Sequence, residues 1–186
     1  MSKPFVIAVN SIAGGGKTSL ANVLHECLPN STIFHFDDFD ATNLYPTDFH
    51  DWHRRGGNLE EFDCLGMKEA VDKEIQQGEV KYIILDYPFG RDHSRFREVI
   101  DLSVYIDTPL DVAMARRILR DYAPQAEASA GTQLRRLRDE LSYYLAKARP
   151  IYLDNRHVRT CDLKLYGLKS LEELRDQVLE AVGIKV

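Results

Sequence analysis

The nine residues NSIAGGGKT at positions 10–18 constrain the fold of this chain more than any other segment. They lie between an apolar run at residues 5–9 and a helical pattern that starts at Lys17. Glycines let backbone N–H groups close around phosphate oxygens, and the N-terminus of the next helix adds a partial positive charge. The order of strand, glycine-rich loop and helix predicts a P-loop rather than an ordinary turn before a helix. The nucleotide-binding glycines are Gly14, Gly15 and Gly16.

The residues that follow these glycines carry the chemistry expected of a P-loop. Lys17 can reach the β- and γ-phosphates, and the Thr18 hydroxyl can ligate Mg²⁺. We expect Ser19 to bind nucleotide beside them. One position departs from the usual pattern, because Ser11 stands where the leading glycine is usual. The expected cofactors are therefore ATP and Mg²⁺.

Short apolar runs and helical patterns alternate along the rest of the chain. The predicted strands are residues 5–9, 32–36, 82–85, 102–106 and 163–166, and the predicted helices are residues 17–28, 65–77, 95–99, 110–122, 132–148 and 171–182. This alternation predicts an α/β fold, a three-layer P-loop NTPase fold with a parallel central sheet, whose ligands bind at the carboxyl ends of the strands. We expect a single domain over residues 1–186, with a helical lid at about 116–138 and a substrate-binding insertion at about 40–64. The small, polar residues 123–132 are interpreted as a mobile lid tip.

The composition excludes several classes of partner. The net charge of −5 argues against a general nucleic-acid or anionic-membrane binder. Three cysteines far apart in the sequence indicate reduced thiols in a cytoplasmic protein, and Cys27 is predicted to lie in the core. The N-terminal segment has one Lys and then only five apolar residues, which we expect to be too short for a signal peptide or a membrane span. We therefore expect a small-molecule partner, and the sequence does not indicate an oligomeric state.

Acidic residues follow the second and third predicted strands. Asp37, within HFDDFD, could accept a proton from a substrate hydroxyl, or it could belong to an acidic turn that caps a helix. Asp38 and Asp40 are more ambiguous candidates of the same kind. Asp86 closes the third strand in a Walker-B arrangement, where a carboxylate positions Mg²⁺, usually through water.

Basic and aromatic residues supply the other candidates. Arg116, Arg117 and Arg120 end one predicted helix, where they could cover a triphosphate or simply form a solvated cationic helix end. Arg149 ends the next helix and is a further candidate. Residues 45–63 do not have the pattern of a plain helix, and they contain the only tryptophan, Trp52. That segment either recognises a small polar ring or is a loop anchored by aromatic side chains.

Together these motifs resemble the P-loop nucleoside kinases, the family of uridine kinases and nicotinamide riboside kinases, over almost the whole chain. The matching segments are Asp37-Asp38-Phe39 after the second strand, Phe62-Asp63 at the head of a helix, Arg116-Arg117-Ile118-Leu119-Arg120, Tyr144 to Arg149, and residues 163–174. Three positions or segments differ: Ser11, Asp86-Tyr87 in place of the family's Glu-Gly, and residues 45–61, which match no uridine or nicotinamide pocket.

The resemblance implies a role for each matching residue. Asp37 would be the general base toward a ribose 5′-hydroxyl, and Asp63 would bind the ribose diol. Thr18 and Asp86 would handle Mg²⁺. Lys17 and the lid arginines would handle the triphosphate, with Arg116 and Arg120 catalytic and Arg117 binding nucleotide. The remaining substrate-binding candidates are Asp38, Trp52 and Arg149.

The sequence thus predicts an ATP-dependent kinase that phosphorylates a hydroxyl of a small metabolite, with a nucleoside or ribosyl compound as the favoured acceptor. One alternative is a kinase of the same fold for pantothenate or a sugar. Another is a nucleotide-binding regulatory NTPase, against which the absence of a guanine-reading NKxD stretch argues.

Overall fold

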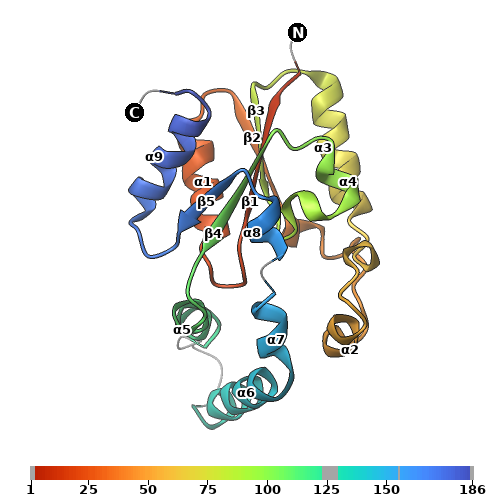
Figure 1. Cartoon of the computed structure of the whole chain (residues 1–186), viewed down its shortest axis with the longest axis vertical. Helices are drawn as coiled ribbons and strands as arrows, with labels where there is room; N and C mark the ends of the chain where they lie inside the picture. Colours follow the sequence, from red (N-terminus) through yellow and green to blue (C-terminus); the bar gives the residue numbers. More distant parts are fainter. Residues whose placement is uncertain (1–2, 123–129, 155, 185–186) are drawn as a thin grey trace.

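A computed structural model describes residues 3–122, 130–154 and 156–184 (Figure 1). Its sheet contains β1 (Phe5–Asn10), β2 (Ser31–His35), β3 (Tyr82–Asp86), β4 (Leu102–Asp107) and β5 (Leu163–Tyr166). The strands pair in the order β2-β3-β1-β4-β5, and every pairing is parallel. The five predicted strands and the parallel sheet are therefore confirmed. Since β1 is central, the loop that follows it opens at the middle of the carboxyl edge.

Helices cover both faces of the sheet, which makes the predicted three layers. On one face, α1 (Lys17–Cys27) and α9 (Leu171–Ala181) pack against Ile7 and Val9 of β1. On the other face, α3 (Leu65–Gln77) packs against Val6 and Ala8, beside the short helices α4 (Ser94–Arg97) and α8 (Arg156–Thr160). Alternate β1 residues thus serve opposite cores, as expected of a strand covered on both sides.

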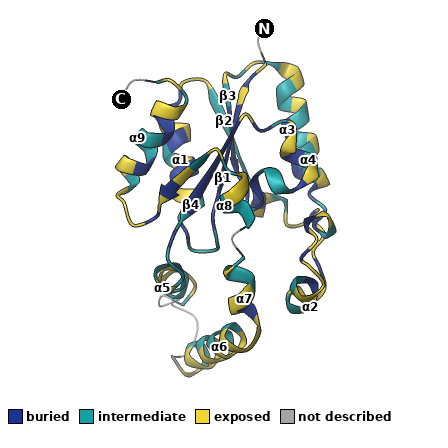
Figure 2. Cartoon of the chain, in the orientation of Figure 1, coloured by how far each residue is buried: buried dark blue, intermediate teal, exposed yellow. Residues whose placement is uncertain are grey.

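The remaining helices lie beyond the carboxyl edge, whereas β1 begins and α9 ends at the opposite edge (Figure 1). They are α2 (Phe49–Arg54), α5 (Leu110–Asp121), α6 (Ala130–Tyr143) and α7 (Arg149–Tyr152), with a π-helical turn at Tyr144–Ala148 between the last two. Exposed and half-buried residues predominate in these helices, while buried residues fill most of β1, β3 and β4 (Figure 2). Most of the predicted lid tip, residues 123–129, lies outside the described residues.

Two details differ from the sequence-based expectations. The segment predicted to lack a helical pattern contains α2, whose N-cap Asp48 accepts hydrogen bonds from the backbone N–H groups of His50 and Asp51. The prediction that Cys27 lies in the core is wrong, because it is exposed at the end of α1 while Leu20 and Leu24 occupy the buried face.

In the part of the chain that the structure describes, no helix combines the length and apolar character that crossing a membrane requires.

Candidate active site

The P-loop has a backbone that only glycine can adopt at its critical positions. Gly14 and Gly16 have φ angles of +82° and +102°, in the left-handed region. A Cβ at Gly15 would lie 1.7 Å from Ser11 Oγ, and a Cβ at Gly14 would lie 2.3 Å from the carbonyl oxygen of Ala113. The loop is thus a backbone-lined cradle without room for side chains, which fits a bound phosphate chain.

Two buried hydroxyls tie this loop to β4 and the residues after it. Ser11, with 6% of its surface exposed, donates a hydrogen bond from Oγ to the carbonyl oxygen of Ile106 at 2.9 Å. Thr108 donates from Oγ1 to the carbonyl oxygen of Gly15 at 2.8 Å. Ser11 does not have a positive φ angle. A serine can therefore replace the usual leading glycine without backbone strain.

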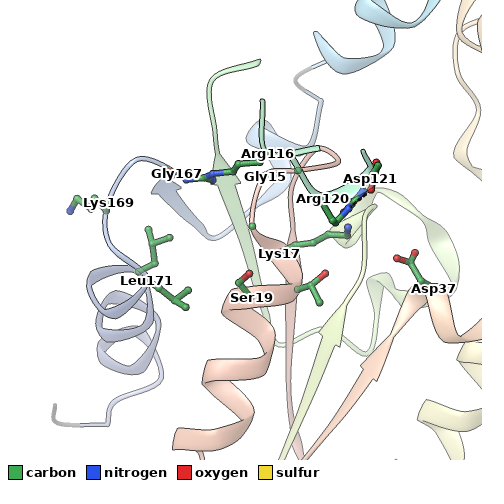
Figure 3. Close-up of a pocket in the computed structure, with 14 residues that line it drawn as sticks. Gly15, Lys17, Ser19, Asp37, Arg116, Arg120, Asp121, Gly167, Lys169 and Leu171 are labelled. Carbon is green, nitrogen blue, oxygen red and sulfur yellow. Dashed lines mark hydrogen bonds and ion pairs between the residues drawn. The ribbon is translucent and has the colours of Figure 1, made fainter. Parts of the chain in front are cut away.

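The P-loop opens into a first cavity of about 790 Å³, within the usual range for ligand sites (Figure 3). Of the predicted site residues it brings together nine: Gly14, Gly15, Gly16, Lys17, Thr18, Ser19, Asp37, Arg116 and Arg120. Residues that the sequence did not single out complete the wall: Asp121, Gly167, Lys169, Leu171 and Leu174. Lys169 could have been suspected, because its loop follows β5 at the same edge of the sheet.

Two arginines reach this cavity from α5, each held by a neighbour. Arg116 donates to the carbonyl oxygen of Gly167 at 3.3 Å. Arg120 pairs with Asp121 at 2.6 Å, and this hydrogen bond raises the pKa of the guanidinium. The same contact lowers the pKa of Asp121. The carboxylate therefore balances the charge of Arg120 inside the cavity.

Arg117 was predicted to bind nucleotide; its stem lies against Gly14, but its guanidinium is held by residues outside the first cavity. Its guanidinium donates to Glu140 at 2.6 Å and to the Tyr152 hydroxyl at 3.0 Å, and it lies 5.5 Å from the centre of the Tyr152 ring. Arg117 does not line the first cavity. It joins α5 to α6 and α7, so its observed contacts are those of a packing residue.

Asp86 closes β3 and is almost fully buried, with 3% of its surface exposed. His35 Nδ1 lies 3.0 Å from one carboxylate oxygen, and the other has no hydrogen-bond partner within the described residues. Such an orphaned buried oxygen fits a water of a Mg²⁺ shell. No group of three His, Cys, Asp or Glu side chains placed to hold a metal exists in the described ranges. Thr18, phosphate oxygens and water would have to supply the other ligands.

A second cavity of about 310 Å³ is lined by residues 11–13 of the P-loop, which do not line the first. Its walls come from the P-loop, the insertion, the segment after β3, β4, and the stretch from the end of α6 into α8: Ser11, Ile12, Ala13, Phe49, Trp52, Leu59, Phe62, Pro88, Phe89, Tyr105, Tyr143, Ala148, Ile151, Tyr152, Asp154, Arg156 and His157. Trp52 is 6% exposed, and its indole N–H donates to the carbonyl oxygen of Asn58 at 2.7 Å. It therefore anchors the insertion and also presents its ring to this cavity.

Three other predicted substrate-binding residues line neither cavity. Asp63 accepts a hydrogen bond from the backbone N–H of Leu65 at the start of α3, and it forms an ion pair with Arg95 at 3.0 Å. Asp38 and Arg149 are exposed. The sequence offered no indication of the Arg95 contact, because the two residues meet only in the folded chain.

Comparisons with known proteins agree with this geometry. The chain is 26% identical over 182 residues to the uridine kinase of Limosilactobacillus reuteri, covering 81% of this chain and 76% of that protein. It is 28% identical over 177 residues to the uridine kinase of Brevibacillus brevis, covering 82% and 79%. No family model matches the chain.

The fold is similar to those of solved P-loop kinases. The APS kinase of Mycobacterium tuberculosis in complex with AMPPNP and APS superposes with a TM-score of 0.57, at 14% identity, over 98% of this chain and 99% of that one. A gluconokinase from Sinorhizobium meliloti gives 0.56, at 14% identity, over 98% and 94%. The uridine kinases that match in sequence support a phosphotransferase of the kinase type. In sequence the chain is similar to uridine kinases, and in fold it is similar to P-loop kinases, as its motifs predicted.

Proposed function

We propose that this protein is an ATP-dependent kinase that phosphorylates a hydroxyl of a small metabolite of the nucleoside or ribosyl class. The observation that carries the proposal is the first cavity, where P-loop, Asp37, Arg116 and Arg120 line one space. A phosphate cradle, a carboxylate and two guanidinium groups are the parts that phosphoryl transfer to a hydroxyl needs. The uridine kinase names of the relatives support the acceptor class.

Each side chain has a distinct task in this proposal. When bound, ATP with Mg²⁺ supplies the transferable γ-phosphoryl group. Lys17 and the P-loop N–H groups bind and orient the phosphates. Asp37 accepts the acceptor's hydroxyl proton on a carboxylate oxygen. Arg116 and Arg120 stabilise negative charge where it develops.

The Asp37→Ala variant tests the assignment of the base. We expect kcat to fall by about 10²–10⁴-fold, because a positioned general base contributes that much. The affinity for ATP should stay close to that of the wild type, since the P-loop is untouched. The matched control is Asp38→Ala, which removes an exposed carboxylate that does not line the cavity. Near-full turnover by Asp37→Ala on the true acceptor would refute the assignment.

An acceptor panel separates this proposal from its alternatives. The panel contains nucleosides, nicotinamide riboside, pantothenate and gluconate, with ADP formation as the readout. The gluconokinase neighbour is the reason to include a sugar acid. If gluconate or pantothenate were phosphorylated and no nucleoside were, the acceptor would belong to another chemical class. Slow ATP hydrolysis that no acceptor accelerates would favour a regulatory NTPase.

A further inference from the structure

Asp86, at the end of β3, has one side-chain partner among the described residues, which is His35 at the end of β2. We infer, building on the proposed function with ATP and Mg²⁺, that His35 is a positioning residue. Its Nδ1–H holds one carboxylate oxygen of Asp86 and thereby keeps the other oxygen available to a water of the Mg²⁺ shell. His35 lines neither cavity, and the sequence did not single it out.

The register of the sheet places both side chains on the face that carries the start of α1. His35 is paired with Asp86 across β2 and β3, and Asp86 is paired with Val9 across β3 and β1. Side chains in register on neighbouring parallel strands point to the same face of the sheet. Val9 belongs to the buried cluster that contains Leu20 of α1, so α1 covers this face. The first turn of that helix contains Thr18, the other candidate for Mg²⁺.

The carboxylate of Asp86 depends on His35 for its orientation. The side chain of Asp86 is only 5% exposed, and no Lys or Arg among the described residues forms an ion pair with it. A carboxylate offers only acceptors, so His35 Nδ1, at 3.0 Å from Oδ2, is the donor whether the ring is neutral or protonated. Oδ1 has no partner within the described residues. The two oxygens of Asp86 therefore have separate tasks.

Removal of the His35 donor would free the carboxylate to turn and would leave a second buried oxygen without a partner. Outer partners that orient the ligands of a metal typically contribute 10- to 100-fold to metal affinity. Because Asp86 would act through water, we expect an effect near the lower end, about tenfold. A purely structural tie between β2 and β3 would instead change the melting temperature and leave the effect of Mg²⁺ on nucleotide binding unaltered.

The contribution of Mg²⁺ to nucleotide binding can be measured without turnover. We would determine the dissociation constant of AMPPNP by calorimetry, once in EDTA and once with Mg²⁺, and take the ratio of the two as the gain due to the metal. In His35→Leu this ratio should fall about tenfold, while the dissociation constant in EDTA stays within about twofold of the wild type, because the P-loop is untouched. A wild type that gains nothing from Mg²⁺, or an unchanged ratio in His35→Leu, would overturn the inference.

Two amide variants distinguish the Nδ1 donor from the rest of the ring. The amide nitrogen of asparagine lies near the position of Nδ1, whereas that of the longer glutamine lies near the position of Nε2. His35→Asn should therefore recover most of the lost ratio, and His35→Gln should resemble His35→Leu. If His35→Leu does not fold, His35→Gln serves as the variant without the donor. Equal ratios in the Asn and Gln variants would show that His35 does not act through Nδ1.

His25→Leu is the matched control. His25 is an exposed histidine of α1 whose Nδ1 lies 2.9 Å from the Ser31 hydroxyl, at the opposite end of β2. Its loss also removes a contact of an imidazole with β2, but far along the strand from Asp86. The ratio should stay that of the wild type. A fall as large as in His35→Leu would overturn the inference, because the effect would not be specific to the contact with Asp86.

A double-mutant cycle shows whether His35 acts through Asp86. Asp86→Asn alone should lower the ratio at least as much as His35→Leu does. The double variant His35→Leu/Asp86→Asn should then lose no more than about twofold beyond Asp86→Asn, since residues that act as one unit are not additive. Additive losses would show that His35 affects the metal independently of Asp86, and they would overturn the inference.

The ratio is measured without an acceptor, so the two proposals can fail separately. A protein that shows the expected ratios but phosphorylates no acceptor would retain the role of His35 and refute the kinase proposal. A protein that phosphorylates an acceptor, and whose His35→Leu variant keeps the ratio of the wild type, would retain the kinase proposal and refute the role of His35.

Discussion

The Ser11 hydroxyl acts as a clamp between the P-loop and the sheet. Its Oγ donates to the Ile106 carbonyl oxygen and also fills the space that a Cβ on Gly15 would need. A glycine at position 11 could neither donate this hydrogen bond nor occupy this space. The departure from the usual P-loop pattern is therefore compatible with a formed phosphate cradle.

We predict that Ser11→Ala lowers the free energy of unfolding by about 1 kcal/mol, the usual worth of one buried hydrogen bond. The melting temperature should fall by about 2–4 °C for a chain of this size, with ATP affinity unchanged because the loop's N–H groups stay in place. Ser103→Ala is the matched control, since Ser103 is also buried but its Oγ has no hydrogen-bond partner in the described structure. A loss of ATP affinity in Ser11→Ala would show that the hydroxyl contributes to binding.

For single residues, the sequence predicted the positions that follow from the succession of strands, loops and helices along the chain. Lys17 and Thr18 begin the helix after the loop that follows β1, and Asp37 comes just after β2, so a parallel sheet brings all three to one edge. Arg117 and Asp63 could not be placed in the same way. Their contacts with Glu140 and Arg95 join segments more than twenty residues apart, and helix spacing alone does not specify them.

Among the elements, α5 is the one on which the P-loop rests. Gly14 meets the backbone of Ala113 so closely that a methyl group cannot fit between them. The same helix carries Arg116 and Arg120 into the first cavity and Arg117 into the α6–α7 contact. A shift of α5 would therefore move the cradle and the arginines together.

Gly14→Ala tests this contact. The added Cβ would meet the Ala113 carbonyl oxygen at 2.3 Å, and alanine would be strained at a φ angle of +82°. We expect a loss of about 1–3 kcal/mol in stability and weakened ATP binding, measured by thermal unfolding and calorimetry. In the control Gly131→Ala the added methyl group meets nothing within 4 Å, and it lies in α6, where alanine favours helix. Equal ATP affinity in the two variants would contradict the prediction.

Periodicity predicted the longer elements, because each strand and helix has a face that must be buried. It did not predict α2, which is six residues long. Two contacts with later residues hold α2 in place. The Trp52 indole N–H donates to the carbonyl oxygen of Asn58, and Arg55, at the C-terminal end of the helix, forms an ion pair with Glu61. Without such tertiary contacts a helix this short would not be stable.

For the whole molecule, Asp92 joins parts that are distant in the sequence. It follows β3 and receives hydrogen bonds from His157 and Thr160 of α8. The sequence predicted the order of the strands along the chain and the edge that carries the site. It could not reveal the two cavities that the P-loop residues line, since their shapes depend on side-chain packing between distant parts of the chain.

The hydrogen bonds of Asp92 with α8 predict that this carboxylate contributes to the loss of stability at low pH. The pKa of Asp92 is lowered in the folded state, so its stabilising contribution is present above the unfolded pKa and is lost as the pH falls through the lowered value. Asp92→Asn should therefore lower the melting temperature at neutral pH and flatten its dependence on pH below about pH 5. Asp111→Asn, an exposed carboxylate on α5, serves as the control. An unchanged acid profile in Asp92→Asn would refute the assignment.

The edge of the sheet at which β1 begins and α9 ends lies opposite the helices around the two cavities (Figure 1). A handle fused at either end would project away from both cavities. Protein captured on a sensor surface through such a handle would keep both openings toward the flowing solution. Nucleotide and acceptor could then be injected separately or together over one immobilised sample, and the order in which they bind could be read directly.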